Sequence, residues 1–185
     1  MTTINLKLYA EGAYTGNGTM SATQPATVKV HDANGVVETL SGTLATDGTV
    51  TVNATSIGDY HLSVRTWNTL GVFTAEAVTL DDTTVDYDFT TAAEQAFGGN
   101  QVEVESGVFA LYSGDVDQND AITQNDLTLV SNASDNSQYG IVICDLNSDE
   151  NVDLSDVSIV TTNLGRVVVY PDTFSIGAPN PHHTH

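Results

Sequence analysis

Apolar and polar residues alternate in short runs through the first half of the chain. The alternating apolar positions are Ile4, Leu6 and Leu8, then Val28 and Val30, Val50 and Val52, and Tyr60, Leu62 and Val64. This period of two is typical of strands that bury one face. Turn-forming sequences such as Asp47-Gly48 separate the runs. About seven strands at this spacing predict an N-terminal antiparallel β-sandwich of the immunoglobulin-like kind.

A different pattern, present twice, occupies the second half. The segments Asp115–Asp126 (DVDQNDAITQND) and Asp145–Asp156 (DLNSDENVDLSD) are twelve residues long, begin thirty residues apart and carry oxygen-bearing side chains at the same offsets. Apolar residues at helical spacing follow each segment: Leu127, Leu129 and Val130 in the first copy, and Val157, Ile159 and Val160 in the second. We therefore expect two loop–helix repeats whose helices share one core. An apolar segment that we expect to be extended leads into each loop, over residues 107–109 and 140–144.

The spacing of oxygen atoms in both loops indicates calcium. This cation takes about six to eight oxygen ligands, and a loop of the EF-hand type supplies them from positions 1, 3, 5, 7, 9 and 12. Position 7 contributes its backbone carbonyl, and position 9 acts through a water. The predicted ligands of two calcium ions are Asp115, Asp117, Asn119, Ala121, Thr123 and Asp126 in the first loop, and Asp145, Asn147, Asp149, Asn151, Asp153 and Asp156 in the second.

Helix capping is the alternative interpretation of part of this pattern. Thr123-x-x-Asp126 and Asp153-x-x-Asp156 match the capping box, in which two side chains bond the backbone at the start of a helix. Capping accounts for positions 9 and 12 only. It leaves the oxygen-bearing side chains at positions 1, 3 and 5, and their repetition, without a reason.

Two further loop positions carry structural expectations. Position 6 is usually Gly because its backbone takes a positive φ, but it is Asp120 in the first loop and Glu150 in the second. Asp tolerates that conformation better than Glu, so we expect the second loop to be the weaker. Position 8 is apolar in both loops, Ile122 and Val152, which predicts a strand-like contact between the two loops.

Composition narrows the function. The chain has 185 residues with 24 acidic and 4 basic side chains, a formal net charge of −20. Such a charge argues against nucleic acid or an anionic membrane as a partner, and no apolar run reaches the roughly 20 residues of a membrane span. Divalent cations are the natural counter-charge. Because calcium is plentiful outside cells, we expect a secreted or extracellular setting, including the cell surface. Cys144, the single cysteine, lies in an apolar stretch and is expected to be buried.

The paired loops, each without an entering helix, resemble a dockerin module over residues 107–170. Together with the strand pattern, this gives a division into a sandwich at 1–90, a connector at 91–106, the dockerin-like calcium-binding module and a tail at 171–185. Within the connector, the sequence of residues 91–97 predicts a short helical turn capped by Thr91. The resemblance also implies a non-catalytic role in which the module docks a cohesin-like protein. The implied partner-binding residues are Gln124, Asn125, Ser131 and Asn132 in the first repeat, and Leu154, Ser155, Thr161 and Thr162 in the second.

Other functions compete with docking. Exposed strand edges would suit a self-associating structural or filament subunit stabilised by calcium. Carbohydrate binding is a third interpretation, in which Trp67 would form an aromatic platform with Tyr14, Tyr60 and Phe73. A terminal cluster of His182, His183 and His185 could gather a transition metal, although a flexible tail is the simpler interpretation. No nucleophile, phosphate-loop or metalloprotease motif occurs, so we expect no enzyme activity.

Overall fold

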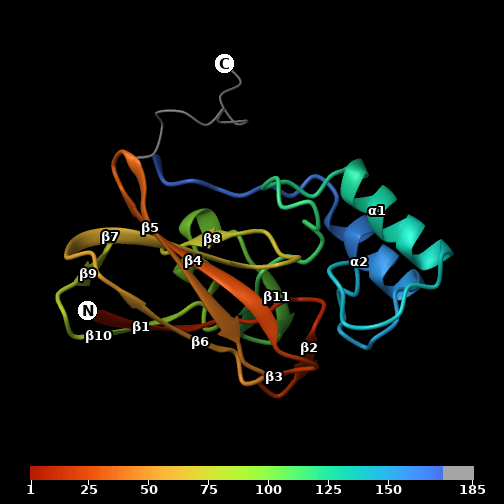
Figure 1. Ribbon diagram of the computed structural model, residues 1–185, viewed down its shortest axis with the longest axis horizontal. Helices are drawn as coiled ribbons and strands as arrows, with labels where there is room; N and C mark the ends of the chain where they lie inside the picture. The colour runs from red at the N-terminus through yellow and green to blue at the C-terminus, as the bar shows by residue number, and fades with distance from the viewer. Residues whose placement is uncertain (173–185) are drawn as a thin grey trace.

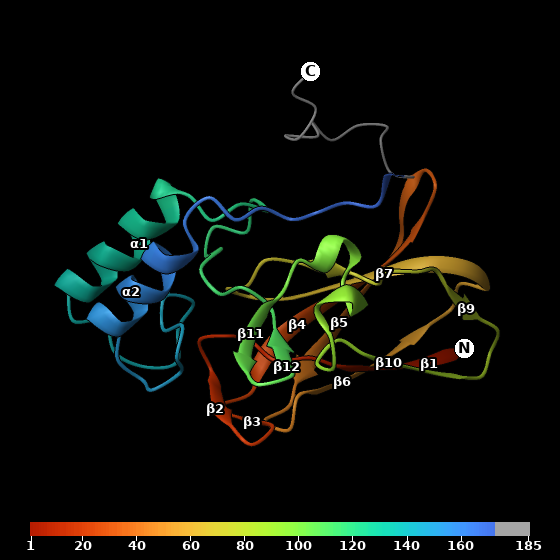
Figure 2. The same ribbon diagram turned by 180° about the vertical axis from the view of Figure 1, so that it is seen from behind.

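The computed structural model describes residues 1–172, which form a β-sandwich with two helices packed together at one end (Figure 1 and Figure 2). One sheet has the strand order β10 (Thr84–Asp88), β1 (Thr2–Lys7), β6 (Thr49–Ala54). The other has the order β5 (Gly35–Leu44), β4 (Gln24–Asp32), β7 (Gly58–Thr66), β8 (Val72–Phe73), and β9 (Val78–Leu80) also pairs with β7. A short hairpin is formed by β2 (Tyr14–Gly16) and β3 (Thr19–Met20). The predicted mainly β sandwich is confirmed.

The sandwich core consists of the alternating residues that the sequence pattern singled out. Ile4, Leu6 and Val50 from the first sheet and Val28 and Leu62 from the second are at most 1% exposed. Tyr60 is only partly buried and packs against the edge of this core. Burial of one face of each sheet explains the period of two, because successive side chains of a strand point to opposite faces.

One strand pair departs from the predicted antiparallel arrangement. β1 pairs with β6 in antiparallel fashion but with β10 in parallel, so that Ile4 lies opposite both Val52 and Val85. The preceding strand β9 belongs to the other sheet, beside β7. The chain therefore crosses from one sheet to the other between β9 and β10, and this crossing brings β10 to β1 in the same direction.

The predicted connector packs on the sandwich. It contains two short 3-10 helices, Ala93–Gln95 and Phe97–Gly99, followed by the hairpin of β11 (Val102–Glu105) and β12 (Val108–Ala110). The predicted cap at Thr91 is wrong, because Ala92 precedes the first turn and makes no side-chain capping bond. Ala110 and Leu111 are fully buried in the sandwich core, and Leu111 pairs with Ala10. The chain thus reaches the first loop directly from the sandwich.

Two helices follow the two loops, as predicted. They are α1 (Gln124–Asp135) and α2 (Leu154–Asn163), and they lie side by side in both views (Figure 1 and Figure 2). Val130 and Val160 are fully buried in a second core between them. Leu129 is 41% exposed, whereas its counterpart Ile159 packs against this core and lies near Gly12 of the sandwich. The two helices therefore share a core, but only α2 has this contact at Gly12.

The segment that leads into the second loop differs from its prediction. Residues 108–110 do form an extended lead into the first loop as β12, although Gly107 belongs to the preceding turn. Before the second loop, Ile143 and Cys144 form a turn, closed by a bond from the Asp145 amide to the Val142 carbonyl. Cys144 is buried as expected, and burial raises the pKa of its thiol. None of the helices in residues 1–172 is long and apolar enough to cross a membrane. The predicted cluster of His182, His183 and His185 lies outside the described residues.

A histidine on β4 is buried in the second sheet. His31 is 8% exposed, its Nε2 lies 2.8 Å from Ser63 Oγ, and its ring packs on Phe73 with centroids 4.9 Å apart. Burial, reinforced by the nearby Lys29 and His61, lowers the pKa of His31 from 6.5 to about 4. The folded protein therefore opposes the charging of this side chain.

The lowered pKa of His31 predicts a loss of stability in mild acid. The unfolded chain binds a proton near pH 6.5 and the folded chain only near pH 4, so the free energy of unfolding falls as the pH decreases through this window. In His31→Gln this contribution, on the order of 2 kcal/mol, is removed and the pH dependence becomes shallower. Urea unfolding at a series of pH values measures it, and equal slopes for the two proteins would contradict the prediction.

Candidate metal centre

The two loops have the same backbone conformation. Positive φ angles occur at position 4, where Gln118 has 60° and Ser148 has 57°, and at position 6, where Asp120 has 70° and Glu150 has 71°. The positive φ expected at position 6 is thus present in both loops, although neither residue is Gly. Because a bulkier non-glycine side chain is strained in this region, Glu150 is held there by the bonds that the loop makes around it.

Each loop folds around the aspartates at its two ends. Asp115 accepts hydrogen bonds from the amides of Asn119 and Asp120, both at 3.1 Å, and Asp145 accepts the equivalent bonds from Asp149 and Glu150 at 3.1 and 3.0 Å. At position 12, Asp126 accepts from the Val116 amide at 2.9 Å. Its counterpart Asp156 accepts from Leu146 at 2.7 Å. The backbone is therefore wrapped around acidic side chains in the same way twice.

These end aspartates are fully buried, which sets the electrostatics of the site. Asp115, Asp126, Asp145 and Asp156 are all 0% exposed. Burial raises the pKa of Asp115 to about 6, against the lowering effect of a nearby arginine, and burial also raises the pKa values of Asp145 and Asp156. Removing carboxylates from water is costly unless a cation or donors compensate. A cation in each loop would provide that compensation.

The carboxylates of the first loop also converge. Oxygen atoms of Asp115, Asp117 and Asp126 all lie within 4.8 Å of one another, and Asp117 is only partly buried, so the cluster is open to solvent on one side. Oxygen donors of this kind suit a hard cation such as calcium. The second loop has Asn147 at the position of Asp117, but it carries Asp149 and Asp153 where the first loop has Asn119 and Thr123, so it does not lack acidic donors. The donor set therefore fits calcium in both loops.

The capping interpretation is correct for the positions that it covered. Thr123 and Asp153 each begin a helix with a complete capping box, and Asp126 and Asp156 return bonds to their amides at 2.8 and 2.9 Å. Capping does not account for the buried acids at position 1. The role of all twelve loop residues as calcium ligands, including Asn119, Ala121, Asp149 and Asn151, stays a prediction.

The predicted contact between the two loops is wrong. Ile122 exchanges backbone bonds of 2.8 Å with Arg166 and Gly165, which follow α2, and Val152 bonds to Gln138, which follows α1, at 3.0 Å. Each loop thus pairs with the segment after the other repeat's helix. The apolar side chains at position 8 fill the second core instead, where Ile122 is fully buried and Val152 is 3% exposed.

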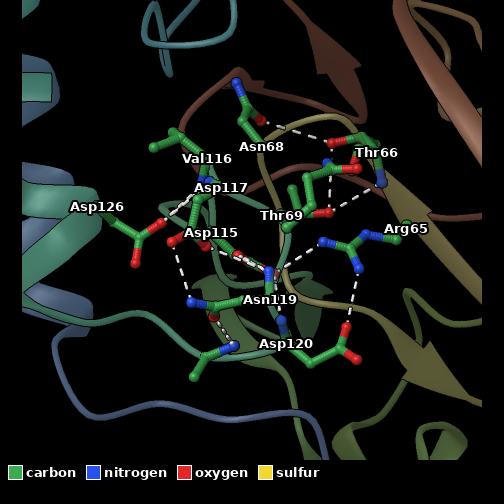
Figure 3. A network of polar contacts seen from close by, with 12 residues as sticks. Arg65, Thr66, Asn68, Thr69, Asp115, Val116, Asp117, Asn119, Asp120 and Asp126 are labelled. Atoms are coloured by element: carbon green, nitrogen blue, oxygen red, sulfur yellow. Dashed lines mark hydrogen bonds and ion pairs between the residues drawn. The ribbon is translucent and has the colours of Figure 1, made fainter. Parts of the chain in front are cut away.

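Contacts with the sandwich are the part of the site that the sequence did not reveal. Arg65 on β7 reaches the first loop, with Nη2 2.8 Å from Asp115 Oδ2 and Nη1 2.8 Å from Asp120 Oδ1 (Figure 3). The second loop contacts the hairpin region, where Ser21 donates to the Asn147 carbonyl at 2.6 Å. Arg65 could have been singled out because it is one of only four basic residues in the chain. Its contact with Asp115 could not be predicted, because the two residues are fifty positions apart in the sequence.

The residues implied as partner-binding lie on one structural unit. Gln124, Asn125, Ser131 and Asn132 are on α1, and Leu154, Ser155, Thr161 and Thr162 are on α2. All are exposed except Ser131, which is partly buried, and Leu154 is 78% exposed. Asn125 is turned toward the loop, where it donates to Asp117 at 2.6 Å. Their role in binding stays a prediction.

The aromatic residues considered for sugar binding do not form one platform. Phe73 is buried against His31, and Tyr14 packs on Tyr9. Trp67 is partly buried, and its indole Nε1 is buried without a hydrogen-bond partner among residues 1–172. These positions leave carbohydrate binding without a structural observation in its favour.

Comparisons with known proteins give a likeness of fold only. No protein-family model matches the sequence, and a search of curated proteins found no match. Two solved structures of type II cohesin–X-dockerin complexes from Acetivibrio cellulolyticus are similar. The complex with a C-terminal interface mutant has a TM-score of 0.58 and that with an N-terminal interface mutant 0.57. In both cases the identity is 19%, and the match covers 90% of this chain and 97% of the other.

This likeness corrects the dockerin assignment of residues 107–170. It extends over 90% of a chain that is mainly β-sandwich and has two helices in its described part, so it points to a cohesin-like sandwich rather than to a dockerin. A separate dockerin module is not shown. The expectation of a cohesin-like partner depended on that assignment and loses its basis. The two loops and the two helices that follow them are nevertheless present in the structure.

The close contact between Gly12 and the second loop yields a test of how tightly the loops are attached. A Cβ at Gly12 would lie 2.4 Å from the Leu146 carbonyl oxygen, which forces the backbone to move. We expect Gly12→Ala to lower the free energy of unfolding by about 1–3 kcal/mol. Gly71→Ala is the control, since its nearest neighbours are at 3.8 Å. Equal effects in thermal or urea unfolding would contradict this packing.

Proposed function

We propose that the chain is a non-catalytic extracellular protein-interaction module whose loop–helix repeats are held folded by two calcium ions. The observation that carries the proposal is the pair of loops with the same backbone, each closed around two fully buried aspartates. A structural turn has no need to bury two acids. A calcium site does, because the ion supplies the charge that the buried carboxylates lack.

The residues that would hold calcium are the loop positions with oxygen donors. Asp115, Asp117 and Asp126 converge in the first loop, and Asp145 and Asp156 occupy the equivalent ends of the second. When bound, calcium would supply positive charge and order the loop. The protein's own contribution is a fixed ring of amide donors that already orients each end aspartate. Calcium outside cells is abundant enough to fill such loops, which favours an extracellular setting.

A docking role is supported by the kind of structure that this fold resembles. The similar structures are complexes between protein modules, and the likeness spans nearly the whole chain. On this chain, α1 and α2 form an exposed surface beside the calcium loops that includes Leu154 and Leu129. Loss of calcium would loosen that surface, because both helices begin at the last residues of the loops. We infer a protein partner of the cohesin–dockerin kind.

Self-association is a second candidate with an observation of its own. β5 is ten residues long, lies at the edge of the five-stranded sheet, and begins at the β4–β5 hairpin, where Val36 is 50% and Val37 is 46% exposed. An exposed edge strand with apolar side chains is a template for pairing with another chain. The chain would then be a structural or filament subunit stabilised by calcium.

A substitution in the second loop tests the calcium function. Asp145→Asn removes a buried charge but also one of the two backbone hydrogen bonds that the carboxylate accepts, and because these effects oppose each other we expect the melting temperature in chelator to change little. Calcium should also stabilise the variant less than the parent. The difference in the free energy of unfolding is the contribution of one site, about 2.7 kcal/mol when calcium is in hundredfold excess over Kd. Asp135→Asn, an acid at the end of α1, is the charge-matched control and should respond as the parent. No calcium-linked rise in the parent would refute the proposal.

Light scattering separates docking from self-association. We expect the pure protein to remain monomeric in calcium, because the proposed docking surface needs a different protein as partner. Polymers that grow with concentration would favour the self-association candidate. In that case Val37→Lys, which places a charge beside the exposed edge of β5, should dissolve them.

A further inference from the structure

Arg65 occupies an unusual position for one of only four basic residues in the chain. It lies on β7 of the sandwich, its side chain is 15% exposed, and it forms ion pairs of 2.8 Å with both Asp115 and Asp120 (Figure 3). These acids are positions 1 and 6 of the first loop. Asp115 is fully buried and Asp120 is 41% exposed, so the guanidinium joins the interior of the loop to its rim. The sandwich thus provides a cation to the first loop.

The second loop has no equivalent. Three ion pairs occur in residues 1–172, and none of them reaches a residue of the second loop. Its position 1, Asp145, accepts two backbone amides, and its position 6, Glu150, accepts a bond from the exposed Tyr139 hydroxyl at 2.7 Å. The two loops therefore have the same backbone conformation, but in the described part of the chain only the first has a basic side chain in contact with it.

We propose, building on the calcium function above, that Arg65 is an internal counter-cation that holds the first loop folded without calcium and leaves the second loop as the calcium-dependent one. The planar guanidinium can bond two carboxylates at once, and a lysine ammonium is less suited to this geometry. In the absence of calcium it supplies part of the charge that Asp115 needs. In its presence it repels the ion, so calcium stabilises the first loop by less than the second.

A further contact supports this anchoring role. Tyr170, in the segment after α2, donates to the other carboxylate oxygen of Asp120 at 2.5 Å, and Tyr170 packs on Phe73 of β8 with ring centroids 5.4 Å apart. Gln118 of the first loop also donates to the Thr66 carbonyl at 3.1 Å. The first loop therefore contacts the sandwich at several points around Arg65. These contacts would help to keep the loop folded when no calcium is bound.

Hydrogen exchange in chelator tests the proposal without relying on calcium. The amides of Asn119 and Asp120 in the first loop have exact counterparts in Asp149 and Glu150, since each pair bonds the aspartate at position 1. We expect the first pair to exchange at least about tenfold more slowly than the second. In Arg65→Gln this difference should disappear. Equal protection of the two loops in the parent, or an unchanged difference in Arg65→Gln, would overturn the proposal.

Lys29→Gln is the matched control. Lys29 lies on the neighbouring strand β4, two residue pairs along the register from Arg65, and it forms none of the ion pairs with the first loop, so the substitution removes the same charge from the same sheet. It should leave the protection of the first loop as in the parent. If Lys29→Gln lowered that protection as much as Arg65→Gln, a general charge effect would replace the proposal.

Melting with and without calcium completes the test. Arg65→Gln should lower the melting temperature in chelator by about 5 °C or more and by less in calcium, so its calcium-linked rise exceeds that of the parent. An equal loss in both conditions would show a merely structural ion pair and overturn the proposal. If no protein responds to calcium, the calcium function fails while the exchange difference in chelator still decides the role of Arg65.

A milder variant covers the case in which Arg65→Gln does not fold. Asp120→Asn removes only the exposed arm of the pair, and it should reduce the protection of the first loop without reaching the level of the second. Full protection in Asp120→Asn would show that the arm contributes nothing, which would contradict the bridging role of Arg65.

Discussion

Burial of negative charge is the constraint around which the loop–helix part of this protein is organised. In a chain with a net charge of −20, four aspartates at the ends of two loops are completely removed from solvent. Backbone amides satisfy their oxygen atoms but supply no net charge, and burial raises the pKa of three of the four. The positions of the helices follow from these residues, because Asp126 and Asp156 also close the capping boxes that begin α1 and α2.

The sandwich takes part in this electrostatics. Arg65 extends from β7 to the first loop, and the second loop lies on the backbone at Gly12 and on Ser21. Segments 102–111 then lead from the sandwich core into the first loop without a free linker. The charge of the first loop is therefore in direct contact with the sandwich through Arg65. The two parts are packed against each other, with α1 and α2 at one end of the molecule.

The features that could be predicted are those that neighbouring residues determine. The alternation at Ile4, Leu6 and Leu8 gave β1, and the repeated oxygen pattern located both loops and both helices, because strand faces and loop positions are matters of local spacing. The parallel pairing of β1 with β10, the partners of Ile122 and Val152, and the contact of Arg65 with Asp115 depend on the path of distant segments. The dockerin assignment failed for a related reason, since it rested on residues 107–170 while the likeness of fold extends over the sandwich as well.

The stoichiometry of calcium binding tests the central claim most directly. Isothermal titration of the chelator-treated chain with calcium should show two ions bound per molecule, with the two sites unequal. Binding should be lost in the variant that carries both Asp115→Asn and Asp145→Asn, because each substitution removes the buried charge at position 1 of one loop. A parent protein that binds no calcium at millimolar concentration, while remaining folded, would contradict the account.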